Sequence, residues 1–277
     1  MPIITISRGS YSKGKSVAEK IAKKLNYECV SRDIILSASK EFNIPEIKLV
    51  RALHDAPSVL DRFTNGKERY VCHLRKSLLE YALRGNLVYH GLAGHYFLSG
   101  LDNVFKLRIT SDMNDRIREE MRRENMSESE ARHLLMKDDD ERRKWGMQLY
   151  GIDTWDSRSY DMVLHIGNLT EDDATDIICN AVQKKAFQET SLSQKQLANM
   201  YLSVKIQSAI IDIQPTAIVK SNDGVVNIVI PDAQSSLTDK ATRKILAKVE
   251  NIDGVKNVQI LLPEAVKGMI NPFHNIK

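Results

Sequence analysis

The chain of 277 residues is long enough to bury a sizeable core, and its length predicts about two domains. A composition of 42% hydrophobic and 27% charged residues is ordinary for a soluble protein. The net charge of +4 is spread almost evenly along the chain, so nucleic acid is not an expected partner. No apolar run approaches the roughly 18–20 residues of a membrane span, and no basic-then-apolar leader is seen, which predicts a cytoplasmic protein.

The cysteines carry little functional information. Cys29, Cys72 and Cys179 are scattered, odd in number and not in C-x-x-C spacing. This pattern excludes a disulfide framework and a zinc site, and we expect buried thiols.

In chain order, the first predicted element is a short buried strand over residues 3–6, and a phosphate-binding motif follows it directly. The motif fits G-x-x-x-x-G-K-S/T and opens a helix with apolar residues at helical spacing. Its glycines let backbone N–H groups surround a phosphate, Lys15 can reach the terminal phosphates, and Ser16 can hold Mg²⁺. The alternative is a strand-to-helix turn that binds nothing. The residues predicted to bind ATP are Gly9, Ser10, Tyr11, Ser12, Lys13, Gly14, Lys15 and Ser16.

Further strands alternate with helical patterns through the first two thirds of the chain. The sequence Ser127–Glu130 is a capping box that begins a helix, and a helical pattern over 177–186 closes the unit. This alternation predicts an α/β P-loop NTPase fold of about five parallel strands with helices on both faces, over residues 1–187. The later strands are predicted over 28–30, 87–89, 104–109 and 162–166.

A polar stretch over 188–196 is the predicted linker to a second domain over 197–266. Its expected elements are a helix over 197–211, a hairpin turning at residues 222–224, a helix over 238–250 and a strand over 255–261. The order αββαβ predicts a small α+β module without a catalytic constellation.

The first domain closely resembles the cytidylate kinase-like family of P-loop nucleoside monophosphate kinases, over nearly all of residues 1–186. The resemblance implies transfer of a phosphoryl group from ATP to a nucleoside monophosphate, CMP or dCMP first, with Mg²⁺. It is carried by Ile6-Ser7-Arg8-Gly9, Ser31–Ile35, Asp115–Glu128, Asp140-Glu141-Arg142, Leu149-Tyr150-Gly151 and Tyr160–Val163.

By this resemblance, residues 137–151 form a mobile lid that carries catalytic arginines. Phosphoryl transfer needs positive charge around the transferring group, so Arg142 and Arg143 on the lid are predicted to act with Lys15, followed by Arg116 and Arg118 or Arg122 near the base of the lid. The alternative for each arginine is a solvated helix face paired with neighbouring glutamates.

The acceptor side is predicted at Asp33 and Gly91. Asp33 resembles the acidic residue that opens the acceptor-binding region of this family, although it can equally cap the following helix. The family usually has Gly-Arg-Gly-Ala after its third strand, whereas this chain has Gly91-Leu92-Ala93-Gly94. Leucine cannot pair with phosphate. His90 and His95 flank this position, with either a partial charge or a structural role.

Three functions therefore stay open on sequence alone: an active nucleoside monophosphate kinase, a nucleotide-binding regulatory protein, and a kinase for another small acceptor. The second domain resembles a BON domain in Asp223–Val226 and Gly254–Val258, which implies a sensing or association module for an unknown ligand or protein. The oligomeric state is open, a homo-oligomer included.

Overall fold

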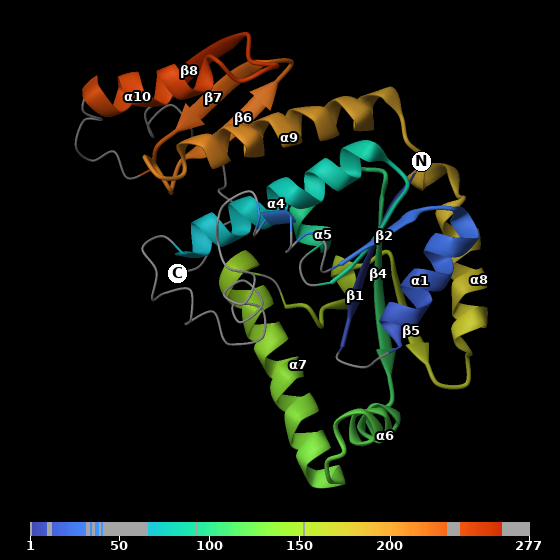
Figure 1. Cartoon of the computed structure of the whole chain (residues 1–277). Helices are drawn as coiled ribbons and strands as arrows, with labels where there is room; N and C mark the ends of the chain where they lie inside the picture. Colours follow the sequence, from blue (N-terminus) through green and yellow to red (C-terminus); the bar gives the residue numbers. More distant parts are fainter. Residues whose placement is uncertain are drawn as a thin grey trace.

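The structure is a computed structural model that describes residues 2–9, 13–31, 34, 37–38, 40, 66–91, 94–151, 153–231 and 239–261. A five-stranded sheet of order β2-β3-β1-β4-β5 forms its centre, and every adjacent pair of strands is parallel (Figure 1). All five strands lie where the sequence predicts them, which confirms the α/β P-loop fold. They are β1 (Ile3–Arg8), β2 (Glu28–Val30), β3 (Leu87–His90), β4 (Val104–Ser111) and β5 (Met162–Ile166).

Helices cover both faces of this sheet because its strands are apolar on both sides. The alternation of strand side chains sends Ile4 and Ile6 to one face and Ile3 to the other. On the first face, α1 (Gly14–Leu25) and α8 (Glu171–Val182) pack over the sheet. On the second lie α4 (Gly66–Arg84) and the short α5 (Gly94–Phe97). Parallel strands end at one edge of the sheet, and this edge carries the phosphate-binding motif.

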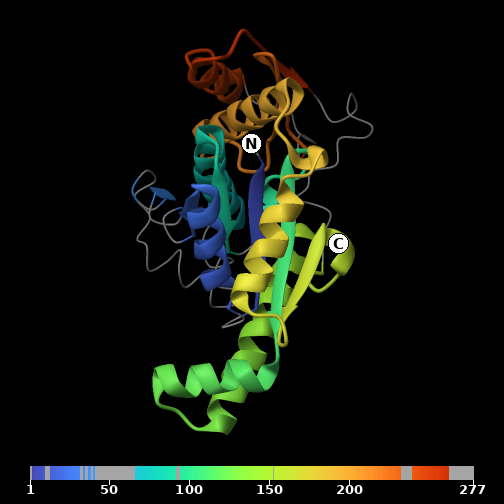
Figure 2. The same cartoon turned by 90° about the vertical axis from the view of Figure 1, so that its right-hand side faces the viewer.

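Two helices, α6 (Met113–Glu124) and α7 (Glu128–Tyr150), form a hairpin that projects beyond the sheet (Figure 2). Asn125 ends α6 in the left-handed conformation with φ 52°. The capping box predicted at Ser127 is present, because its hydroxyl accepts from the Glu130 backbone N–H and the Glu130 carboxylate accepts from the Ser127 N–H. A small apolar cluster of Ile117, Ala131 and Leu135 joins the two helices.

The C-terminal part has the predicted element order αββαβ. Its strands β6 (Ile218–Asn222), β7 (Val225–Val229) and β8 (Asn257–Leu261) form a sheet in that order, antiparallel and then parallel. The hairpin turns at Asp223 and Gly224, with φ 51° and 85°. The crossover helix is α10 (Asp239–Val249).

The sequence prediction of a linker over 188–196 is wrong from Ser191 onward. A short 3₁₀ turn at Lys185–Phe187 is followed by α9 (Ser191–Ile210), whose start is capped by Thr190. Five of the six residues from Ser191 to Gln196 are polar and the sixth, Leu192, is exposed, and a mainly polar helix turn of this kind cannot be distinguished from a loop by polarity alone.

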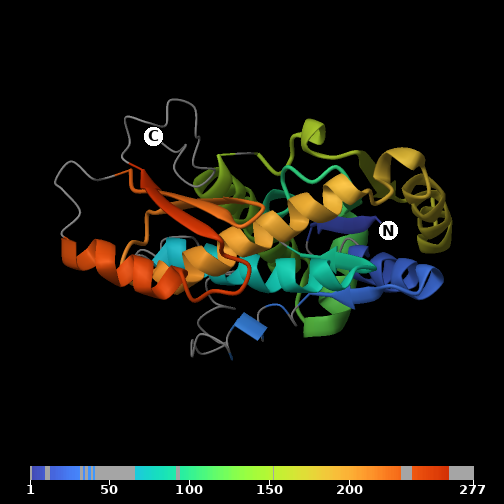
Figure 3. The same cartoon turned by 90° about the horizontal axis from the view of Figure 1, so that it is seen from above.

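Helix α9 packs between the two sheets (Figures 1 and 3). One side contributes Leu197 and Val204 to the core that contains α4. The opposite side contributes Ile206 and Ile210 to the core of the small sheet. The Tyr201 hydroxyl also donates to Glu80 on α4 at 3.0 Å. The two parts of the chain therefore share this helix.

The structure also shows how exposed the three cysteines are and whether a helix could span a membrane. Cys72 and Cys179 are buried thiols, as predicted, and Cys29 is half-buried. Within the described ranges, no helix has the length and hydropathy that crossing a bilayer requires.

Candidate active site

The site begins where β1 runs into α1. Lys13 adopts a left-handed conformation with φ 61° and turns the chain into the first residue of α1. Gly14 is required at this turn because a Cβ there would lie 2.8 Å from Cβ of Arg8. The helix therefore starts directly at the end of the strand, with its N-terminal N–H groups at the sheet edge, where an anion is favoured. Residues Ser10, Tyr11 and Ser12 of the motif lie outside the described residues.

Two predicted side chains lie on the first turn of α1. Lys15 is largely exposed, with 66% of its side chain accessible, and its Nζ lies 3.7 Å from Glu19. The Ser16 hydroxyl donates a hydrogen bond to the Glu171 carboxylate on α8. Lys15 is thus in a position that a phosphate can reach, and the predicted magnesium ligand Ser16 already contacts a carboxylate.

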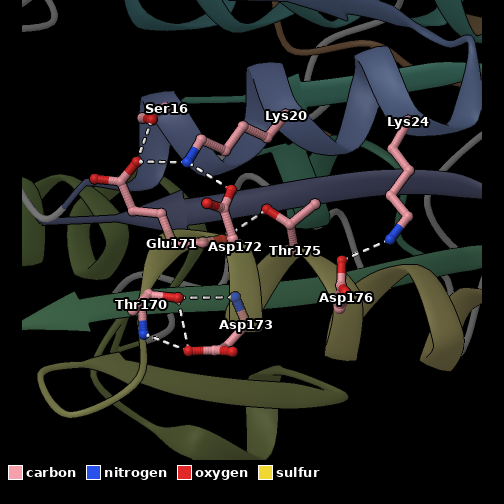
Figure 4. Close-up of polar contacts among 9 residues, drawn as sticks. All are labelled: Ser16, Lys20, Lys24, Thr170, Glu171, Asp172, Asp173, Thr175 and Asp176. Atoms are coloured by element: carbon pink, nitrogen blue, oxygen red, sulfur yellow. Dashed lines mark hydrogen bonds and ion pairs between the residues drawn. The ribbon is translucent and has the colours of Figure 1, made fainter.

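Below Ser16, α1 and α8 are joined by ion pairs (Figure 4). Lys20 lies 2.7 Å from Asp172 and 3.5 Å from Glu171, and Lys24 lies 2.5 Å from Asp176. Hydrogen bonds to Asp172 and Asp176 raise the pKa of Lys20 and of Lys24, respectively. The basic and acidic residues recur at i, i+4 on their helices, so the pairs hold the two helices in one register.

Arg116 reaches the start of the phosphate-binding loop from α6. Its guanidinium forms two hydrogen bonds of 2.8 and 2.9 Å with Asp139 on α7, and only 8% of its side chain is exposed. A Cβ added at Gly9 would lie 3.5 Å from this guanidinium and 3.5 Å from the Asp139 carboxylate. The pair therefore lies against Gly9, and Asp139 balances the charge of Arg116.

Arg142 also reaches the loop, one helical turn beyond Asp139. Its Nη1 donates to the backbone carbonyl of Arg8 at 3.0 Å. Residues from α6 and α7, more than 100 positions away in sequence, thus meet the chain at the end of β1 and at the first residue of the motif. Arg116 thus lies against Gly9 and Arg142 contacts Arg8, while their catalytic roles stay predictions.

Arg143 faces elsewhere. It donates three hydrogen bonds of 2.6–3.0 Å to Asp153, and its guanidinium lies 4.8 Å from the centre of the Trp155 ring. The hydrogen bonds from Arg143 lower the pKa of Asp153. Arg143 therefore ties the end of α7 to Asp153 and Trp155, away from the described residues Gly9 and Lys13–Ser16 of the motif.

Arg118 and Arg122 match the alternative of a solvated helix face. Both are well exposed, and each pairs with an acidic residue three positions earlier on α6, Asp115 and Glu119, respectively. Such pairs contribute at most a few tenths of a kcal/mol each.

On the acceptor side, Asp33, Leu92 and Ala93 lie outside the described residues. Gly91 follows β3, and its N–H donates to the Ile6 carbonyl at 3.2 Å. A Cβ at Gly91 would lie 2.7 Å from the Tyr89 hydroxyl, and one at Gly94 would lie 2.3 Å from the Tyr89 ring. Both glycines are therefore needed to fit the chain around Tyr89.

The two histidines that flank this position are buried. His95 packs with ring centres 3.8 Å from Tyr96 and 4.9 Å from Tyr160. Burial, with smaller contributions from Lys106 and Arg108, lowers the pKa of His95 to about 3. His95 is therefore uncharged at neutral pH and does not supply the positive charge of the arginine usual in the family.

Sequence reasoning missed two acidic residues of the site, Asp139 and Glu171. The run Thr170–Asp173 is a capping box, and this signal could have placed the start of α8. Nothing local shows that Glu171 meets Ser16, because the two residues are 155 positions apart and only the fold brings them together.

The donors near Ser16 fit a magnesium ion that is bound mainly through nucleotide and water. Mg²⁺ prefers oxygen ligands and usually takes one or two from protein, the others being phosphate oxygens and waters. Ser16 supplies a hydroxyl oxygen, and its proton is donated to the Glu171 carboxylate. Among the described residues, no group of three or more His, Cys, Asp or Glu side chains could hold a metal alone.

Comparisons with known proteins point to one family. The sequence pattern of the cytidylate kinase-like family matches residues 3–168. The cytidylate kinase of Staphylothermus marinus is 24% identical over 188 residues, which cover 66% of this chain and 98% of that protein. The cytidylate kinase of Sulfolobus acidocaldarius is 26% identical over 185 residues, with 66% and 94% covered.

Similar solved structures cover about two thirds of the chain. An uncharacterized protein from Eubacterium ventriosum has a TM-score of 0.49 at 22% identity, with 67% of this chain and all of that chain covered. Dephospho-CoA kinase from Campylobacter jejuni has a TM-score of 0.35 at 15% identity, with 67% and 98% covered. Since the family pattern spans more than half of the residues and includes the P-loop, β1, β3, β4 and β5, the chain belongs to the cytidylate kinase-like family.

Proposed function

We propose that this protein transfers a phosphoryl group from ATP to a nucleoside monophosphate, with CMP or dCMP as the first candidates. The observation that carries the proposal is the convergence of Arg116 and Arg142 on the P-loop at Gly9 and Arg8. Family membership and the two relatives named cytidylate kinase support the choice of reaction and acceptor.

Each of these residues has a role that phosphoryl transfer requires. Backbone N–H groups of residues 9–16 bind the phosphates, and Lys15 supplies charge to the terminal ones. Arg142 and Arg116 stabilise the charge on the transferring group, with Arg143 as a further catalytic candidate. Ser16 would hold Mg²⁺, which would supply positive charge to neutralise the phosphates. Since chemistry of this kind depends on positioning, these groups need to be in place before the reaction.

Arg116 is held by Asp139 in this structure, so its charge is balanced until a phosphate competes for it. A triphosphate carries more negative charge than one carboxylate, and arginine can form bidentate hydrogen bonds with either group. We propose that closure of the lid over residues 137–151 transfers Arg116 from Asp139 to phosphate. Asp33 and Gly91 stay the proposed acceptor-binding residues.

The C-terminal part is proposed as a BON-like binding module over 197–266 that senses a ligand or recruits a protein to the kinase domain over 1–187. Its element order and separate apolar core support a distinct module. Its sharing of α9 with the core around α4 provides a physical connection between the two.

The test is a coupled assay of ATP turnover against a panel of monophosphates, with CMP and dCMP first. We expect turnover with a pyrimidine monophosphate, and its loss in Lys15→Ala, because that variant lacks the charge at the terminal phosphates. The variant should also bind ATP less tightly by about 2–3 kcal/mol, as for a lost charge-assisted contact.

Lys23→Ala, an exposed lysine on the same helix, serves as the matched control and should retain turnover. ATP binding without transfer to any monophosphate would contradict the proposal and favour a nucleotide-binding regulatory protein.

A further inference from the structure

We infer that Glu171 is a positioning residue for magnesium: by accepting the proton of the Ser16 hydroxyl in a hydrogen bond, it directs the free lone pairs of Ser16 Oγ towards the cation. The inference rests on the proposed function, and it assigns a role to a residue of α8 that no P-loop motif contains. It concerns the two side chains that meet at the top of Figure 4.

The hydrogen bond between Ser16 and Glu171 has a defined direction. A carboxylate accepts and does not donate, so the proton shared by Ser16 and Glu171 belongs to Ser16. A hydroxyl has two acceptor lone pairs besides its single proton. With the proton directed at Glu171, these lone pairs face away from the carboxylate. A hydroxyl fixed in this way meets a cation with oxygen and not with hydrogen.

Several contacts hold Glu171 in place. It is the first residue of α8, directly after the capping residue Thr170, and the Thr175 hydroxyl donates to its backbone carbonyl at 2.7 Å. About a quarter of its side chain is exposed, and Lys20 lies 3.5 Å from its carboxylate. The carboxylate therefore has two partners on α1, one neutral and one cationic. Partners of this kind orient a metal ligand, and removing one commonly costs about 10–100-fold in metal affinity.

Other residues already join α1 to α8, so the contact between Glu171 and Ser16 is not needed for that purpose alone. Asp172 and Asp176 already pair with Lys20 and Lys24, at 2.7 and 2.5 Å. Helix pairing therefore has contacts that do not involve Ser16. Among the described acidic residues of α8, Glu171 is the one with a hydrogen bond to the phosphate-binding motif. A purely structural Glu171 and a positioning Glu171 thus predict different results when metal binding is measured.

The experiment measures binding of ATP to the full chain by calorimetry, with and without Mg²⁺, for Glu171→Ala, Glu171→Gln and the matched control Asp172→Asn. We expect Glu171→Ala to bind metal-free ATP within about twofold of the parent and to lose about 10-fold of the gain that Mg²⁺ provides. Glu171→Gln keeps an acceptor oxygen and should lose less. Asp172→Asn should keep the full gain, and thermal melting verifies that each variant is folded.

The possible failures are distinguishable. If the parent gains nothing from Mg²⁺, both the proposed function and this inference are overturned. If the parent gains and Glu171→Ala gains equally, the inference alone fails. Equal weakening of ATP binding with and without Mg²⁺ in folded Glu171→Ala would make the residue a structural contact and overturn the inference. Should Glu171→Ala not fold, Glu171→Gln decides, since a weakening equal to that of Asp172→Asn also contradicts the role.

Discussion

At the scale of single residues, the catalytic role proposed for Arg142 can be tested by substitution. Arg142 donates to the Arg8 carbonyl at the mouth of the P-loop, and its partner there is a neutral carbonyl. We expect Arg142→Ala to lower kcat by about 10²-fold while changing ATP affinity little, because it removes charge needed mainly in the transition state. Steady-state kinetics and calorimetry check the two parts separately.

Arg122→Ala is the matched control, since Arg122 is exposed and pairs with Glu119 on its own helix. The control should leave kcat unchanged. If Arg142→Ala behaves as Arg122→Ala does, Arg142 contributes only to packing of the lid.

Two buried histidines predict how stability depends on pH. Burial, with smaller contributions from Arg69 and Lys76, lowers the pKa of His73 to about 4, and the pKa of His95 is about 3. Both values lie below the value near 6.5 of an unfolded histidine. The unfolded chain therefore binds these protons first, and stability falls as pH drops below about 6.5. Between pH 7 and 5 each histidine should cost on the order of 2 kcal/mol.

Urea unfolding at pH 7 and pH 5 measures this loss. His73→Gln should reduce the dependence on pH, whereas His133→Gln, at an exposed position of α7, should not. A free energy of unfolding that is equal at both pH values would show that these side chains are protonated in the folded state.

At the scale of elements, the local sequence pattern was sufficient to predict an element wherever that element buries a continuous apolar stripe. The five strands, the capping box at Ser127 and the hairpin at Asp223-Gly224 were all predictable, because strand alternation, capping and turn chemistry are written within a few residues. The start of α9 was not, since five of its first six residues are polar, Leu192 is exposed, and its buried apolar residues begin at Leu197.

The candidate site also has one part that could be predicted from the sequence and another that could not. The motif from Gly9 to Ser16 is contiguous and could be found from sequence. The contacts of Arg116 with Asp139 and of Ser16 with Glu171 depend on how α6, α7 and α8 pack, which no short pattern encodes. Long-range pairing of charged residues is therefore the part of the site that only the structure provides.

At the scale of the whole molecule, the sharing of α9 predicts the effect of truncation. A chain that ends at residue 187 lacks Leu197 and Val204, which are buried against α4. Full burial of such side chains contributes about 1.5–3 kcal/mol each, so this chain should lose several kcal/mol of stability and self-associate through the uncovered face. A chain that ends at residue 211 retains these contacts and should be more stable against urea.

Light scattering and urea unfolding of the two shortened chains make the comparison. Equal stability of both would mean that α9 contributes nothing to the core around α4. It would also restore the simpler arrangement of two independent domains.

The position of α9 also affects how the protein folds as it is synthesised. The last strand of the large sheet, β5, ends at Ile166, but the outer side of α4 is covered only after α9 has left the ribosome. At about 5–20 residues per second, this interval lasts a few seconds. During that time the nascent chain carries an exposed apolar surface, which is the kind of surface that chaperones bind. The emergence of α9, and not the completion of the sheet, thus marks the point at which the nascent kinase can leave their protection.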